Sequence, residues 1–223
     1  MLIYSLFLLS FLLLIALLLS VRAEMLDDSG KSIIKVWATK PALSLMFIAV
    51  ALMHATPWSA YSLLLLAGLC LCFLGDVFLI PNNARCFMLG LISFLAGHLF
   101  YIAAFAVLFT PDQTLFLAVL VLIGIDTIVA IWLKDRLQDM RNPVYVYMAA
   151  ISVMVLAACG VFANDNLASA GKWLVLLGAI SFYISDLFVV RQKFVSSSVF
   201  NPMMGLPLYY GGQFALALSL GHL

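Results

Sequence analysis

The stretch FLGDVFLIPNN, residues 73–83, closes a long apolar run and carries a carboxylate, Asp76, a few residues before the run ends. A second stretch, YISDLFVVRQK at residues 183–193, repeats the pattern with Asp186 just before its own polar end. Charged residues are rare in this chain, so two carboxylates in matching apolar surroundings are informative. They indicate an internal duplication, and the sequence on either side of each stretch shows how far the similarity extends.

The similarity continues into the segment that follows each stretch. MLGLISFLAGHLF, residues 88–100, aligns with MMGLPLYYGGQFA, residues 203–215. The aligned pairs include Gly97 with Gly212, His98 with Gln213 and, more weakly and further upstream, Pro41 with Pro143. Three matches in the same order predict two four-helix repeats, residues 1–110 and 111–223, within one transmembrane domain.

The composition is that of a membrane protein. Of 223 residues, 66% are hydrophobic and only 9% are charged, and the mean hydropathy is +1.19. One bilayer crossing takes about 20 apolar residues, and helices satisfy their own backbone hydrogen bonds in lipid. We therefore expect an all-α integral membrane protein with eight transmembrane helices and no separate soluble domain, the first helix being retained. The expected spans are residues 1–21, 37–55, 58–80, 86–109, 114–133, 144–163, 171–191 and 203–222.

Basic residues predict the orientation, because loops facing the cytoplasm are enriched in Lys and Arg. We number the connections between successive expected helices in chain order, so that odd-numbered connections face one side of the membrane and even-numbered connections the other. Lys172 is the one basic residue on the side of the even-numbered connections. The others fall at or just inside the odd-numbered connections: Arg22, Lys31, Lys35, Lys40, Arg85, Lys134, Arg136, Arg141, Arg191 and Lys193. We expect a multi-pass protein of the bacterial inner membrane, with both termini outside the cytoplasm.

Neither cysteine nor histidine usage predicts a metal site. The four cysteines lie in or beside apolar segments without a CxxC motif and are expected to be small core residues. The three histidines are too scattered to form a local metal-binding motif. We expect no metal, no cofactor and no nucleic-acid partner.

Parallel repeats related by an axis along the membrane normal would make Asp76 and Asp186 equivalent. Each lies about 7 Å inside the predicted cytoplasmic boundary, so the two carboxylates could face each other. Ionisable groups inside a membrane usually line a cavity or a proton path, although pairing with a nearby base or capping a helix is the structural alternative. Asp126 has no counterpart in the other half, and its role stays open between buried hydrogen bonding and function.

Other polar groups gather at the same level of the expected bundle. A single tyrosine there would more often anchor a helix at the interface, but together with two aspartates the group predicts a polar pocket in the cytoplasmic half. The candidate binding residues are Lys40, His98, Tyr101, Tyr145, Tyr147, Ser185, Tyr209, Tyr210 and Gln213.

Five motifs carry a resemblance to a known family. They are TKP at residues 39–41, GDVFL at 75–79, GLISFLAGHLFY at 90–101, FYISD at 182–186 and YYGGQ at 209–213. In this order, the chain from about residue 39 to its end resembles the YhhN-like lysoplasmalogenases, which are eight-helix membrane hydrolases. Phe78 departs from the family pattern, which often has an aliphatic residue there, and this bears only on pocket shape.

The resemblance implies hydrolysis of the vinyl ether bond of a lysoplasmalogen. The products would be a fatty aldehyde and glycerophosphoethanolamine or glycerophosphocholine, and Asp76 and Asp186 would be the catalytic pair. Such a reaction parallels glycoside hydrolysis, with one carboxyl as general acid and one carboxylate that stabilises the cation and activates water. Lys40, together with Arg85, is expected to meet the lipid phosphate. Which aspartate is the acid is left open.

A different class of function also fits these features. A small proton-coupled transporter would use parallel repeats and intramembrane carboxylates, although both aspartates are expected near one surface rather than at the midplane. A structural or receptor-like bundle would leave the repeated aspartates unexplained. Transport requires an intact vesicle, whereas hydrolysis proceeds in detergent.

Overall fold

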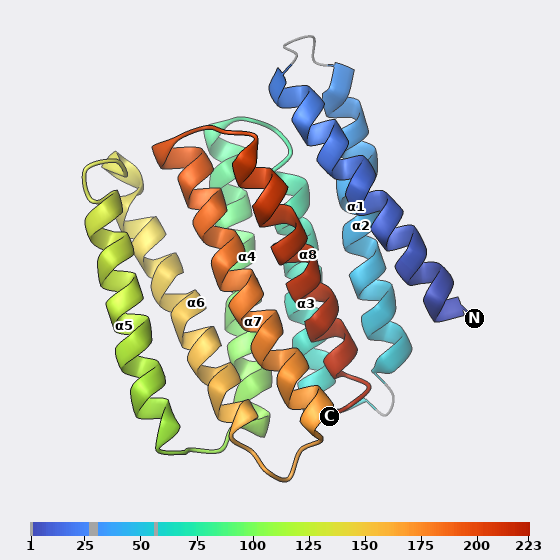
Figure 1. Cartoon of the computed structure of the whole chain (residues 1–223), viewed down its shortest axis with the longest axis vertical. Helices are drawn as coiled ribbons and strands as arrows, with labels where there is room; N and C mark the ends of the chain where they lie inside the picture. The colour runs from blue at the N-terminus through green and yellow to red at the C-terminus, as the bar shows by residue number, and fades with distance from the viewer. Residues whose placement is uncertain (1, 27–30, 56–57) are drawn as a thin grey trace.

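The computed structural model describes residues 2–26, 31–55 and 58–223, and helices dominate this part of the chain (Figure 1). The long helices are α1 (Leu2–Leu26), α2 (Lys31–His54), α3 (Ala60–Phe78), α4 (Ala84–Leu108), α5 (Thr114–Leu133), α6 (Arg141–Phe162), α7 (Ser169–Val190) and α8 (Phe200–Ser219). Two short elements complete them: η1 (Gln138–Met140) is a 3₁₀-helix, and η2 (Arg191–Val195) is a π-helix that continues α7.

The expected all-helical membrane architecture is confirmed, and the helix boundaries lie within a few residues of the expected spans for most elements. The largest difference is at α2, which begins at Lys31 rather than at residue 37. Within the described residues, seven helices are long and apolar enough to cross a membrane, and α8 is not among them. The sequence of α8 explains this, because it includes Asn201, Tyr209, Tyr210 and Gln213. α8 instead lies against α7, among the central helices of the bundle (Figure 1).

Local sequence signals set several helix starts. Ser59 caps α3 in a reciprocal capping box with Ser62, and the Asn83 side chain accepts a hydrogen bond from the Cys86 amide at the start of α4. The expected turn at residues 56–59 lies partly outside the described residues, as does the turn at residues 27–32. The start of α1 and the C-terminus lie at the same end of the bundle, because successive long helices run in opposite directions (Figure 1).

Helix packing in the two halves of the chain follows the same pattern. α3 packs extensively on α4, and α7 packs equally extensively on α8. α2 contacts α3 as α6 contacts α7, and the halves meet through two matching contacts, α4 with α6 and α8 with α2. These paired contacts are arranged as they would be in two four-helix units related by a twofold axis, although α1 and α3 also contact α8. The duplication itself stays a prediction from the sequence.

Matching glycines allow the closest helix approaches. A Cβ on Gly97 would lie 3.2 Å from the Gly68 carbonyl oxygen, and a Cβ on Gly212 would lie 2.8 Å from the Gly178 carbonyl oxygen. Gly68 precedes Asp76 by the same eight residues that separate Gly178 from Asp186. Small residues let the backbones of membrane helices pack closely, so each glycine contact fixes one carboxylate-bearing helix against its partner.

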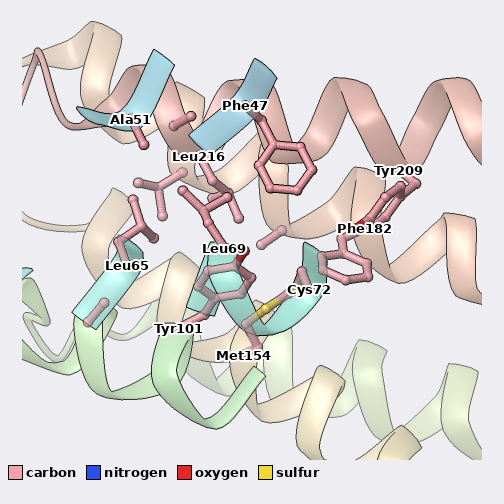
Figure 2. Packing of buried hydrophobic residues seen from close by; sticks show 14 of the residues in the cluster. Phe47, Ala51, Leu65, Leu69, Cys72, Tyr101, Met154, Phe182, Tyr209 and Leu216 are labelled. Carbon is pink, nitrogen blue, oxygen red and sulfur yellow. The ribbon is translucent and has the colours of Figure 1, made fainter. Parts of the chain in front are cut away.

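The core between the halves is aromatic and aliphatic. Figure 2 shows buried side chains from α2, α3, α4, α6, α7 and α8 converging, with Phe182 of α7 beside Tyr209 of α8. The rings of Phe182 and Tyr209 are 5.2 Å apart at a steep angle, and Phe94 of α4 packs edge-on against both. This cluster holds the two halves together next to the carboxylates.

α5 lies at the edge of the bundle and packs on α6 (Figure 1). Its one intramembrane carboxylate, Asp126, accepts hydrogen bonds from the Ser152 hydroxyl of α6 and the Tyr183 hydroxyl of α7, both at 2.7 Å. Such interhelical hydrogen bonds stabilise membrane bundles by roughly 1 kcal/mol each. These contacts give the half-buried Asp126 a hydrogen-bonding role that joins α5 to its neighbours.

Adjacent glycines in α8 provide a matched test of close packing. Gly212→Ala is expected to destabilise the protein by about 1–3 kcal/mol, because the new methyl group collides with the α7 backbone. Gly211→Ala is expected to be neutral, because a Cβ there meets no neighbouring atom within 4 Å among the described residues. Thermal unfolding of the two purified variants in detergent compares them directly, and equal midpoints would contradict the proposed helix contact.

Candidate functional site

A cavity of about 510 Å³ opens beside the ends of α3 and α7 and the starts of α4 and α8. These helix ends lie at the end of the bundle opposite the chain termini (Figure 1). The cavity volume lies within the range of small-molecule binding sites, roughly 300–1,000 Å³. Side chains from α2, α3, α4, α6, α7, η2 and α8 line it, and both Asp76 and Asp186 are among them. The structure therefore brings the two sequence-related carboxylates into one cavity.

Asp76 is almost completely buried and is tied to two other helices. Its Oδ1 lies 3.3 Å from the Lys40 Nζ, and the same ammonium donates to the Asp76 backbone carbonyl at 3.1 Å. Its Oδ2 accepts hydrogen bonds from the Ser44 hydroxyl of α2 and the Tyr209 hydroxyl of α8, both at 2.7 Å. A cation and two hydroxyl donors around one carboxylate favour its ionised form.

Asp186 has different surroundings, although it holds the equivalent position in α7. Its Oδ2 accepts a hydrogen bond from the Tyr147 hydroxyl of α6 at 2.6 Å. In the described part of the chain, no Lys, Arg or His nitrogen lies within 4.0 Å of its carboxylate. Asp186 also lines a second, much smaller pocket of about 20 Å³ between α5, α6 and α7. The two carboxylates are thus similar in position and unlike in charge environment.

The expected binding residues divide into two groups. Lys40, Tyr147, Ser185 and Tyr209 line the cavity with the aspartates. Tyr210 lies behind it, where its hydroxyl is 3.2 Å from the Ser44 Oγ and donates to the Lys40 carbonyl at 3.3 Å.

The remaining candidates lie away from the cavity lining. Tyr101 is fully buried and donates to the Gln213 Oε1 at 2.7 Å. The His98 ring packs against Tyr147 and Phe182 about one turn deeper than the lining residue Phe94. Tyr145 faces α5, where its hydroxyl lies 3.4 Å from the Ala130 carbonyl.

Some residues that line the cavity or contact its carboxylates were not anticipated from the sequence. Ser44 could have been found, because it follows Lys40 by four residues and so shares its helix face. Phe87 and Lys193 were harder to anticipate, because the start of α4 and the η2 turn are far apart in the sequence and meet only in the folded bundle. Within residues 2–26, 31–55 and 58–223, no cluster of three or more His, Cys, Asp or Glu side chains is arranged to hold a metal ion.

The fold and the site define a class of protein: membrane proteins built as an eight-helix bundle with two carboxylates in one cavity. Residues 35–220 match the model of the YhhN family. The chain therefore belongs to the YhhN family, as the sequence motifs predicted.

Relatives with known names are of two kinds. A protein of Escherichia coli O6:H1 named uncharacterized membrane protein YhhN is 28% identical over 186 residues, which cover 82% of this chain and 86% of the relative. The human protein named lysoplasmalogenase TMEM86A is 30% identical over 159 residues, which cover 68% of this chain and 62% of the relative. Its bovine counterpart is 26% identical over 158 residues, with the same coverage. No solved structure matches this chain.

The buried ion pair allows a test of what holds Asp76. Lys40→Met is expected to destabilise the protein by about 3 kcal/mol, because it leaves a buried carboxylate without its cation. Adding Asp76→Asn to Lys40→Met should recover part of this loss, because the uncompensated charge is removed. Thermal unfolding of the single and double variants in detergent measures the coupling, and strictly additive losses would show that the two side chains do not interact.

Proposed function

We propose that this protein is a lysoplasmalogenase, which hydrolyses the vinyl ether bond of a lysophospholipid to a fatty aldehyde and a glycerophospho-headgroup. The observation that carries the proposal is the pair of carboxylates, Asp76 and Asp186, lining one cavity within the membrane-embedded bundle. Family membership and the names of the mammalian relatives support it. A single-chain lipid suits a cavity of this volume whose walls are largely apolar.

The unlike surroundings of the carboxylates suggest their roles. Asp76 is matched by the ammonium of Lys40 and two hydroxyl donors, so it serves as the ionised carboxylate. Among the described residues, Asp186 receives one side-chain hydrogen bond, at Oδ2, which leaves Oδ1 available to carry a proton. A carboxyl in an apolar site without a nearby cation suits a general acid. We therefore assign Asp186 as the acid and Asp76 as the base.

The first half of the reaction transfers the proton from Asp186 to the β-carbon of the vinyl ether. The double bond supplies the electron pair for the new C–H bond, and an oxocarbenium ion forms at the α-carbon and the ether oxygen. The negative charge of Asp76 stabilises this cation. Water then attacks the α-carbon and loses a proton to Asp76, which gives a hemiacetal.

The second half breaks the hemiacetal and restores both groups. Asp76 returns its proton to the ether oxygen while the C–O bond breaks, and the glycerophospho product leaves as an alcohol. Asp186, now ionised, takes the proton of the hemiacetal hydroxyl as the aldehyde forms. The sum is one vinyl ether and one water converted to one aldehyde and one alcohol, with both carboxyls in their starting states.

Substitution of either aspartate is the direct test of this proposal. The native protein in detergent is expected to release aldehyde from a vinyl ether lysophospholipid, and Asp76→Asn and Asp186→Asn each to reduce the rate by about 10²-fold or more. Retained thermal stability separates a lost catalytic group from a lost fold. No aldehyde from the native protein, across headgroups and chain lengths, would overturn the proposal and favour proton-coupled transport, to be measured as uptake into vesicles.

Two tyrosines of α6 provide a second, finer test. Tyr147→Phe removes the one hydrogen bond that the structure gives the Asp186 side chain, and a rate lowered by about tenfold is expected. Tyr145→Phe alters a weak contact on the α5 side and should retain most of the activity. The measurement is the rate of aldehyde release by each variant. Equal losses would contradict a specific role for the hydrogen bond between Tyr147 and Asp186.

A further inference from the structure

The mouth of the cavity carries a cation that the proposed chemistry does not use. Lys193 of η2 lines the cavity and is exposed. Its Nζ lies over the Phe87 ring of α4, 4.8 Å from the ring centroid. Across the described residues, no carboxylate lies within 4.0 Å of this ammonium. The charge is therefore held in place by an aromatic ring without being neutralised.

The other basic residues near the site are already committed. The ammonium of Lys40 contacts both a side-chain oxygen and the backbone carbonyl of Asp76. The Arg191 guanidinium donates to the Asn201 side chain and is absent from the cavity lining. Arg85, which the sequence suggested as a second phosphate contact, does not line the cavity either. Of the cations in the lining, Lys193 is the one whose charge is available to a ligand.

The segment that carries Lys193 is braced by hydrogen bonds. The Gln192 Oε1 accepts from the Ser198 amide and from the Asn201 Nδ2, and the Gln192 Nε2 donates to the Ser197 Oγ at 2.9 Å. The Asn201 Nδ2 also donates to the Ser196 carbonyl. These contacts fix the π-helical turn and the start of α8, and π-helical turns frequently occur at functional sites. The neighbouring polar groups thus form hydrogen bonds with one another, and the Lys193 ammonium is available to bind a ligand.

We propose that Lys193 binds the phosphodiester of the lysolipid at the mouth of the cavity, while Asp186 and Asp76 act on the vinyl ether deeper inside. This inference rests on the proposed function. Seven residues separate Asp186 from Lys193, which corresponds to about 10 Å along a helix. The glycerol backbone separates the vinyl ether from the phosphate by a distance of the same order, so one lipid can reach both groups.

Binding of a substrate analogue tests this without any turnover. The probe is a saturated 1-O-alkyl lysophospholipid, which has no vinyl ether bond, and its affinity for the full chain is measured in detergent by calorimetry. Lys193→Gln is expected to weaken binding about tenfold, because a charge-assisted contact to the phosphate is lost. Lys193→Arg should retain most of the affinity. Lys134→Gln, an exposed lysine at the same end that does not line the cavity, is the matched control and should bind as the native protein does.

The corresponding 1-O-alkyl glycerol, which lacks phosphate, separates charge recognition from packing. Its affinity should be unchanged by Lys193→Gln, and an equal loss for both lipids would overturn the inference by showing that Lys193 acts through packing on Phe87. Displacement of the lysophospholipid by inorganic phosphate at comparable concentration would assign the site to free phosphate and also overturn it. Binding that depends on Lys193, without aldehyde release, would support this inference and overturn the proposed hydrolysis. Aldehyde release by the native protein, with no change in affinity for Lys193→Gln, would support the hydrolysis and overturn this inference.

Discussion

The carboxylate of Asp76 is the interaction on which the site depends. An unpaired charge in hydrocarbon is expensive, and here Lys40 and Ser44 of α2 and Tyr209 of α8 all converge on it. The same contacts that make the charge tolerable tie α2 and α8 to α3. All three helices contribute residues to the cavity lining, so the contacts that stabilise the carboxylate also position part of the site.

The two halves of the bundle combine near-symmetric packing with asymmetric chemistry. Glycine contacts hold α3 on α4 and α7 on α8 in the same way, and the aspartates occupy equivalent positions. Their partners are different: Lys40 pairs with Asp76, whereas Asp186 accepts a hydrogen bond from Tyr147 and has no cation within 4.0 Å among the described residues. The proposed reaction needs one protonated and one ionised carboxyl, and these different neighbours suit the two carboxylates to the two roles.

Sequence reasoning was most successful where lipid imposes simple rules. Apolar runs predicted the helices closely, and the GDVFLI and SDLFVV stretches predicted which carboxylates would share a cavity. It was weaker on side-chain direction, because a position within a helix does not reveal which way the helix is rotated. Tyr145 and Tyr147 are two residues apart and so face different neighbours, α5 and the cavity. The pairing of Lys40 with Asp76 depends on the same rotation, as does the approach of Lys193 to Phe87.

Each of the two aspartates contacts a residue of the helix that is synthesised just before its own. The Lys40 that pairs with Asp76 belongs to α2, the helix made immediately before α3, and the Tyr147 that contacts Asp186 belongs to α6, made immediately before α7. Each carboxylate can therefore enter the bilayer beside a partner that is already present, without waiting for the helices made later. Tyr209, made near the end, adds its hydrogen bond to an aspartate whose charge is already compensated. Each half of the chain carries its own means of inserting an acidic residue into lipid.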